Sequence, residues 1–347
     1  MYVKDLAIAM SEQGHDVRIL FLNRAADIGR DPDYEQHFLN ELTQAKVSYG
    51  FIGYRARRNP LLGAYRMREE NLRYRPDVLH CHLYYAAAFS LPTAGAKVLY
   101  THHSIDVHAP RQLYRLLDLR VSAYVAICEA CGALLHTLTR RPVIQIDNAV
   151  QPRRLTRRKP GRNDRKPVSI VVASRLSAEK NLGLLLKAAA RLGDLDFVIK
   201  IAGEGPERQS LEQESALLGL TNKVTFLGNC RNISNLLSEA DIFAMSSSYE
   251  GLPISLIEAT LTGLPVVVTD VGGCAELVRE VGNGIVVPAN DLEGYSLGLR
   301  RLVVSGQLRE TYAHNALRNS GRYQLATSVD AHLALYGHLT GRQADPL

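Results

Sequence analysis

Two carboxylates flank a glycine–proline turn in the stretch 249–259, YEGLPISLIEA. Glu250 precedes the turn, and Glu258 lies eight residues later in a predicted helix. Pro253 fits the first helical position, where its missing N–H costs nothing. Helical side chains lean toward the N-terminus, so both carboxylates are expected at one crevice. There they would accept hydrogen bonds from neutral hydroxyls, such as those of a ribose and a sugar ring.

The same helix start suits a phosphate group. The first N–H groups, those of Ile254 and Ser255, have no intrahelical acceptor, and the helix dipole favours an anion beside them. Upstream, Arg175 and Lys180 follow the predicted strand 168–174. An arginine fork and a lysine point charge can balance a diphosphate without a metal ion. The predicted site therefore combines cations for a diphosphate with acids for hydroxyls.

A third turn follows the next predicted strand. Gly203 and Gly205 occur in the segment AGEGP, and Gly251 precedes Leu252 and Pro253 in the turn described above. Glycine lets a ligand approach the backbone closely, so all three glycines are predicted to line the binding site.

Short apolar runs alternate with helical patterns throughout the chain. The runs are continuous, as expected of parallel strands covered on both faces by helices. This alternation predicts an α/β protein with doubly wound sheets. The expected strands are 17–22, 77–82, 97–102, 123–128, 142–146, 168–174, 197–203, 224–228, 241–245, 265–270 and 284–288.

Length and composition fit a two-domain globular protein. The chain has 347 residues, of which 46% are hydrophobic and 22% charged, and its net charge is +6. We find no apolar run of the ~18 residues needed to span a membrane and no signal-peptide pattern at the start. Five cysteines are too few for a disulfide scaffold, and a cytoplasmic location is the simplest expectation.

The predicted domains are residues 1–150, residues 168–325 and a C-terminal tail, residues 326–347, that packs back on the first domain. Between them, residues 151–167 form a linker rich in lysine, arginine and proline. The linker is either a solvated hinge or a contact for an anionic partner. No aromatic residues alternate with its basic ones, so we do not expect a nucleic-acid partner.

The second half resembles glycosyltransferase family 4. The segments that carry the resemblance are ASRLSAEKN, IAGEGP, VTFLGN, ADIFAMSSSYEGLPISLIEA, TGLPVVVTDVGG and NGIVVP, in this order. In the first half GHDVRIL, DVLHCH, YTHHS and YVAICEA match less sharply. The resemblance implies a retaining, nucleotide-sugar-dependent enzyme of the GT-B fold, in which two Rossmann-like domains face each other across a cleft. It also implies cell-surface polysaccharide or lipopolysaccharide assembly as the setting.

The resemblance also assigns roles. Glu258 would bind the ribose of the donor, and Glu250 would contact the transferred sugar near its reacting carbon. Arg175 and Lys180 would hold the diphosphate. Gly251, Leu252 and Pro253 would form the turn over the sugar and phosphate, and Ile254 would also bind the donor. In the first domain His103, rather than His102, would approach the sugar, so the implied catalytic residues are Glu250 and His103.

No metal or other cofactor is expected. Asp194-Leu-Asp196 has the D-x-D spacing but precedes a strand, at the wrong end for catalysis. His80 and His82 share one face of a strand, and no carboxylate set accompanies them, so structural or acceptor-site roles are favoured over metal binding.

Residues 55–75 carry many arginines interspersed with Leu61, Leu62, Tyr65, Met67 and Leu72. This segment is either an amphipathic helix that covers the sheet or a surface that binds an anionic membrane and receives a lipid-linked acceptor.

The chain opens on a helical pattern over residues 2–13, where a doubly wound domain usually opens on a strand and a glycine-rich turn. We therefore expect the first domain to lack its first strand. Two alternatives to a transferase stay open. One is a nucleotide-sugar epimerase of the same overall fold, and the other, suggested by the absent turn and the basic linker, is a truncated, non-catalytic nucleotide-sugar- or polyanion-binding protein.

Overall fold

The computed structural model of the protein describes residues 2–29, 31–107, 109–158, 167–230 and 232–342. These residues form two compact units. Unit 1 comprises the described residues of Met1–Ile127 and Cys131–Asp147 and the chain from Leu325; unit 2 comprises Cys128–Ala130 and the described residues of Asn148–Gln324.

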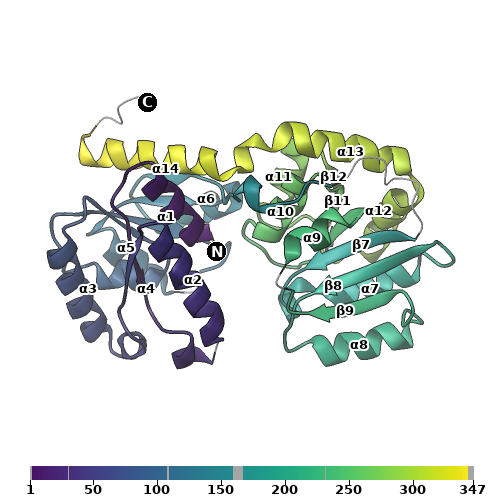
Figure 1. Ribbon diagram of the computed structural model, residues 1–347, viewed down its shortest axis with the longest axis horizontal. Helices are drawn as coiled ribbons and strands as arrows, with labels where there is room; N and C mark the ends of the chain where they lie inside the picture. Colours follow the sequence, from purple (N-terminus) through teal and green to yellow (C-terminus); the bar gives the residue numbers. More distant parts are fainter. Residues whose placement is uncertain (1, 30, 108, 159–166, 231, 343–347) are drawn as a thin grey trace. The chain divides into compact units, whose positions relative to one another are not determined.

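Unit 2 is built on one six-stranded parallel sheet with the strand order β12-β11-β10-β7-β8-β9. Figure 1 shows β7, β8 and β9 side by side in this unit. The strands are β7 (Val168–Ala173), β8 (Phe197–Ala202), β9 (Val224–Gly228), β10 (Ile242–Met245), β11 (Val266–Thr269) and β12 (Gly284–Val287). The helices are α7 (Leu182–Ala190), α8 (Arg208–Leu217), α9 (Ile233–Ser238), α10 (Ile254–Thr262), α11 (Cys274–Val281), α12 (Leu292–Val304) and α13 (Gly306–Asn319), with 3-10 turns η3 (Pro152–Arg154), η4 (Ala178–Lys180) and η5 (Ser320–Tyr323).

The continuous apolar strands of unit 2 are buried, as the sequence predicted. Ile170, Ile199 and Ile242 contribute to one core cluster, against which Leu185 of α7 and Leu299 of α12 pack. From β7 the chain adds β8 and β9 on one side of the sheet, then crosses to add β10, β11 and β12 on the other. The strand order therefore reverses between β7 and β10, and in open α/β sheets ligands bind outside the carboxyl ends of the strands at such a point.

Unit 1 contains two parallel sheets, β1-β2 and β3-β4-β5-β6. The strands are β1 (Arg18–Phe21), β2 (Ser48–Phe51), β3 (Val78–Cys81), β4 (Lys97–His102), β5 (Val121–Ala126) and β6 (Val143–Gln145). The helices are α1 (Tyr2–Glu12), α2 (Pro32–Gln44), α3 (Pro60–Tyr74), α4 (Tyr84–Phe89), α5 (Arg111–Leu117), α6 (Glu129–Leu138) and α14 (Leu325–Thr340), with 3-10 turns η1 (Ala26–Ile28) and η2 (Tyr54–Arg57).

In the described part of unit 1, no strand pairs with both sheets and joins β1-β2 to β3-β4-β5-β6. Leu20 of β1 and Leu79 of β3 instead pack on the same cluster, which contains Met67 and Phe89. The described residues begin with α1, as the helical pattern predicted. The sequence reading missed β2, because Ser48-Tyr49-Gly50-Phe51 has no continuous apolar run.

Helix α14 belongs to unit 1, although it follows the last helical turn of unit 2 (Figure 1). Leu335, Tyr336 and Leu339 pack against buried residues of β4 and β5, including Leu99 and Val125. Among the described helices, none combines the length and apolar character that crossing a bilayer requires.

Part of the predicted basic linker is folded onto unit 2; residues 159–166 of it lie outside the described residues. Arg158 is buried, and its Nη2 lies 3.3 Å from Oδ1 of Asp241. The other oxygen, Oδ2 of Asp241, accepts the backbone N–H of Ser169 at 2.9 Å. The interpretation of this segment as a solvated hinge is therefore wrong at Arg158, because its guanidinium has a buried carboxylate partner.

Candidate functional site

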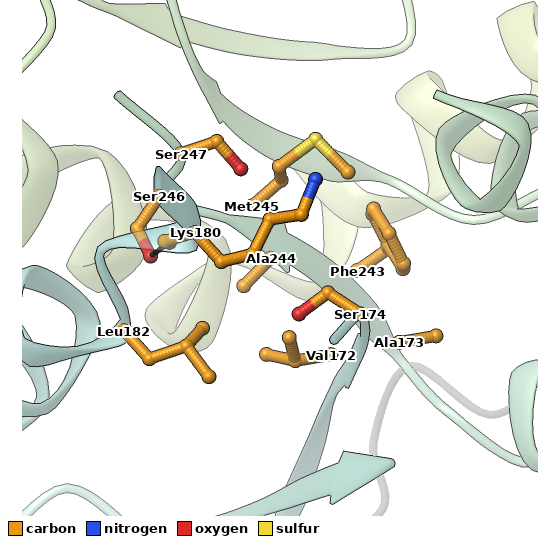
Figure 2. Close-up of a pocket in the computed structure, with 10 residues that line it drawn as sticks. All are labelled: Val172, Ala173, Ser174, Lys180, Leu182, Phe243, Ala244, Met245, Ser246 and Ser247. Atoms are coloured by element: carbon orange, nitrogen blue, oxygen red, sulfur yellow. Dashed lines mark hydrogen bonds between the residues drawn. The ribbon is translucent and has the colours of Figure 1, made fainter. Parts of the chain in front are cut away.

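The loops that follow β7 and β10 meet at the point where the strand order of unit 2 reverses. A small cavity lies between them; the empty space in and around it, open solvent included, is about 180 Å³. Figure 2 shows its lining: Ser174 after β7, Lys180 at the end of η4, and Ser246 and Ser247 after β10. The Oγ of Ser174 is buried and has no hydrogen-bond partner among the described residues. The cavity thus combines a lysine with three hydroxyls.

Glu250 is held beside this cavity by two side chains. It is 7% exposed, and its Oε1 accepts hydrogen bonds from Lys180 Nζ at 2.8 Å and Ser247 Oγ at 2.7 Å. Ser247 is fixed in turn, because Thr269 Oγ1 donates to its carbonyl oxygen at 2.5 Å. The carboxylate therefore has one charged and one neutral donor, which orient it.

The two loops are also joined through their backbones. The N–H of Ser248 donates to the carbonyl oxygen of Glu179 at 2.8 Å. Ser246 Oγ donates to the carbonyl oxygen of Lys180 at 3.2 Å, which is drawn as a dashed line in Figure 2. These hydrogen bonds hold the two loops together. Lys180 and Glu250 are therefore brought into contact by their loops as well as by the attraction between their charges.

Two hydrogen bonds from other parts of the chain hold the turn from Gly251 to Pro253 in place. The carbonyl oxygen of Gly251 accepts the N–H of Gly273 at 2.7 Å, and that of Leu252 accepts Asn148 Nδ2 at 2.9 Å. The sequence reading missed Asn148, Ser247 and Thr269 as supporting residues. Only Ser247 carried a local signal, since it lies three residues before Glu250 in the same polar loop.

The predicted helix start is displaced by one residue. Pro253 is the N-cap, with φ −69° and ψ 130°, and α10 begins at Ile254. The expectation that Pro253 is the first helical residue is therefore wrong; the ring fixes φ but leaves ψ free to be extended. Pro253 has no side-chain acceptor, so it cannot cap the first N–H groups of α10 as a serine would. Its carbonyl accepts the N–H of Ile257 at 3.3 Å.

The remaining predicted donor-binding side chains lie on the same loops and helix. Arg175 is exposed, five residues before Lys180 in the loop after β7. Glu258 is half-buried on α10, one turn after Ile254. Their contacts with a donor stay predictions.

Gly203 and Gly205 lie where the backbone of a neighbouring loop leaves no room for a side chain. A Cβ on Gly203, where φ is +144°, would lie 1.8 Å from the carbonyl oxygen of Ser174. A Cβ on Gly205 would lie 2.1 Å from that of Leu176. These glycines let the loop after β8 pack against the loop after β7, which places them next to the predicted site. Contact between them and a donor stays a prediction.

In unit 1, His103 follows β4 and belongs to a group of half-buried and buried rings. Its Nε2 lies 2.9 Å from Nδ1 of His82, and the two rings stack with centroids 5.2 Å apart. Tyr2 of α1 contacts both rings edge-on. Burial lowers the pKa of His103 to about 4, because the imidazolium form loses its hydration. His103 is therefore neutral near pH 7.

His80 and His82 share a face of their strand, as predicted, with ring centroids 4.3 Å apart. The two nitrogens of His80 lie 2.6 Å from Tyr336 of α14 and 2.6 Å from Thr101. The described residues contain no group of three or more histidine, cysteine or acidic side chains arranged to hold a metal ion. The contacts of His80 give it a packing role against α14, and the acceptor-site alternative for the two histidines stays a prediction.

Two family models match adjacent parts of the chain. The model described as glycosyl transferases group 1 matches residues 152–319, and that described as Glycosyltransferase Family 4 matches residues 1–154. The chain belongs to glycosyltransferase family 4. The first match contains Lys180, Ser247, Glu250 and α10, and the second contains His103.

Relatives of this family 4 protein include the amylovoran biosynthesis glycosyltransferase AmsD of Erwinia amylovora, which is 31% identical over 160 residues, 46% of this chain and 45% of the relative. The lipopolysaccharide core biosynthesis glycosyltransferase LpsE of Rhizobium meliloti is 29% identical over 167 residues, 48% of each chain. The chain thus spans about half the length of these curated relatives.

Among solved structures, HepE of Anabaena in complex with UDP is similar in fold, with a TM-score of 0.77 and 20% identity; the match covers 93% of this chain and all of HepE. The predicted GT-B fold, with two Rossmann-like halves, is confirmed.

Proposed function

We propose that this protein transfers a sugar, with retention of configuration, from a nucleoside-diphosphate donor to a glycan or lipid-linked acceptor. The observation that carries the proposal is the Lys180–Glu250 pair at the strand-order reversal, beside the N-terminus of α10. The names of the relatives support polysaccharide or lipopolysaccharide assembly as the setting. The complexes of HepE with UDP and UDP-glucose support a nucleotide-sugar donor.

In the proposed complex the diphosphate lies at the N-terminus of α10. Arg175 and Lys180 balance its charge, and the first N–H groups of the helix donate to its oxygens. Glu258 accepts the ribose hydroxyls, and Glu250 accepts hydroxyls of the transferred sugar. His103, neutral near pH 7, contributes a hydrogen bond to the sugar without adding charge.

Transfer breaks the bond between the anomeric carbon and the β-phosphate oxygen, and the electron pair stays on that oxygen. The acceptor hydroxyl attacks the same face, and its proton passes to the departing phosphate, so no covalent enzyme intermediate is needed. Arg175 and Lys180 stabilise the charge that develops on the leaving group. We assign no step to a metal ion or cofactor, and chelation with EDTA is expected to leave the rate unchanged.

The test begins with a thermal-shift screen of nucleotide sugars, followed by product analysis with and without a glycan acceptor. The expected result is a donor whose sugar is transferred without change at its other carbons. Turnover to an epimerised nucleotide sugar would replace the proposal with the epimerase alternative. Donor binding without turnover would replace it with the non-catalytic alternative.

Two variants divide the roles within the site. Glu258→Ala is expected to weaken nucleoside-diphosphate binding about tenfold, because it removes a charged acceptor of the ribose hydroxyls. Glu250→Ala is expected to leave that affinity within about threefold while it removes most of the turnover. Equal losses of affinity in the two variants would contradict the assignment.

A further inference from the structure

Helix α3 is anchored to unit 1 by one face only. Met67 is buried in the cluster with Phe89, and Asn71 Nδ2 donates to the carbonyl oxygen of Ala94 at 2.9 Å. Gly63, Met67 and Asn71 are the buried residues of the helix and follow one another at four-residue spacing. This inner face covers the sheet, as one of the two sequence readings of residues 55–75 expected.

The outer face of α3 carries a second, exposed apolar stripe. Leu61, Tyr65 and Leu72 are 83%, 57% and 55% exposed. With Arg68 they occupy positions i, i+4, i+7 and i+11, which lie on one face of a helix. Large apolar side chains that are aligned and exposed in this way pack against no part of the core. Such a patch indicates a surface that binds a protein or a membrane.

Positive charge surrounds the stripe. Residues 54–75 contain seven arginines and two glutamates. Arg55, Arg57 and Arg58, at and just after η2, are exposed and precede the stripe. Of the two acids, Glu70 is paired with Arg18 at 2.9 Å, and exposed Glu69 accepts a hydrogen bond from the hydroxyl of Tyr65 at 2.6 Å. The arginines outnumber the acids in this segment, so the exposed apolar stripe lies in a region of net positive charge.

We infer that the outer face of α3, together with η2, docks unit 1 on an anionic membrane surface. Leucine and tyrosine side chains enter the boundary between headgroups and acyl chains, where tyrosine is favoured, while the arginines contact lipid phosphates. The inference goes beyond the proposed function by assigning the surface, and it rests on that function only in placing a lipid-linked acceptor there.

Nucleic acid is the other polyanion that such a charge could attract. It would use the arginines but would leave the leucine stripe exposed, since affinity for a phosphate backbone comes from its charge. The alignment of Leu61 and Leu72 with Tyr65 is the reason to favour a bilayer.

The test is sedimentation of the full chain with vesicles of phosphatidylcholine alone or with 30% phosphatidylglycerol, at about 0.1 M salt. The wild-type protein is expected to bind the mixed vesicles only. Arg55→Gln/Arg57→Gln/Arg58→Gln should lower this binding by about a hundredfold. Leu61→Ser/Tyr65→Ser/Leu72→Ser should lower it by about tenfold or more.

Matched controls lie on unit 2. Leu217→Ser removes a leucine that is 89% exposed on α8, and Arg300→Gln/Arg301→Gln/Arg318→Gln removes three exposed arginines. Neither should change vesicle binding. All variants should keep the wild-type melting temperature and nucleoside-diphosphate binding, which separates this inference from the proposed function.

Three results would overturn the inference. These are wild-type protein that stays in the supernatant, equal binding to both kinds of vesicle, and a loss in the arginine variant with none in the apolar variant. The last result would indicate a general polyanion site.

Discussion

Nζ of Lys180 lies 2.8 Å from Oε1 of Glu250, so the loop after β7 and the loop after β10 are joined by an ion pair where the strand order reverses. The lysine is the group assigned to the diphosphate, and the carboxylate is the group assigned to the sugar. In a nucleotide sugar these two parts are covalently adjacent, so the proposal requires the two side chains to lie close together.

Replacing Glu250 with glutamine is expected to lower kcat by about a hundredfold or more while nucleoside-diphosphate affinity changes little. The amide keeps the size of the side chain but removes the charge beside the reacting carbon. Steady-state kinetics with the donor identified by the screen would measure this. Glu293→Gln, at an exposed position on α12, is the control and should keep the wild-type rate. A wild-type rate in Glu250→Gln would remove Glu250 from the chemistry.

Lys180→Ala and Arg175→Ala are each expected to weaken binding of the nucleoside diphosphate by about tenfold and binding of the nucleoside by much less. The reason is that both cations are assigned to phosphate oxygens. Calorimetric titrations of the two ligands would measure the difference, with exposed Arg191→Ala as the control. Similar losses for both ligands would refute the charge clamp.

The buried pair between Arg158 and Asp241 predicts a stability effect far from the chemistry. Asp241→Ala is expected to lower the free energy of unfolding by about 3–5 kcal/mol, because it leaves a buried guanidinium without its carboxylate and the N–H of Ser169 without its acceptor. Urea denaturation followed by circular dichroism would measure it. Asp77→Ala breaks an exposed pair with Arg342 and should cost about 1 kcal/mol or less. Equal losses of unfolding free energy in the two variants would show that burial does not increase the contribution of the Arg158–Asp241 pair to stability.

The buried histidines predict acid sensitivity of unit 1. Burial lowers the pKa of His103 and His332 to about 4, and it holds the pKa values of His80 and His82 well below 6.5. Below about pH 6.5 the unfolded chain binds protons that the folded unit does not, so stability present at neutral pH is lost as pH falls toward 4. Each histidine contributes at most about 1.4 kcal/mol per pH unit.

This slope can be measured by denaturation between pH 7.5 and pH 5. His332→Phe should make the dependence shallower, because it removes one buried titratable group, whereas exposed His314→Gln should leave it unchanged. If His332→Phe retains the full wild-type slope, burial does not control the titration.

The sequence alone predicted the α/β class from its continuous apolar strands, which are local patterns, whereas the GT-B fold and the roles of the site residues in unit 2 were expected from the resemblance of its motifs to family 4. Arg175 and the two glutamates, Glu250 and Glu258, were likewise visible in the motifs. The short strand β2 was not, because Ser48-Tyr49-Gly50-Phe51 becomes a strand only when it pairs with β1.

Tertiary structure decided what the residues do for one another. Asn148 and Thr269 are far from Glu250 in sequence, and only the folded sheet brings their hydrogen bonds to its loop and turn. Burial of Arg158 in a predicted linker, and neutral histidines beneath α14, likewise depend on which surfaces lose water. The loss of water around these polar side chains is a property of packing, and no local pattern in the sequence indicated it.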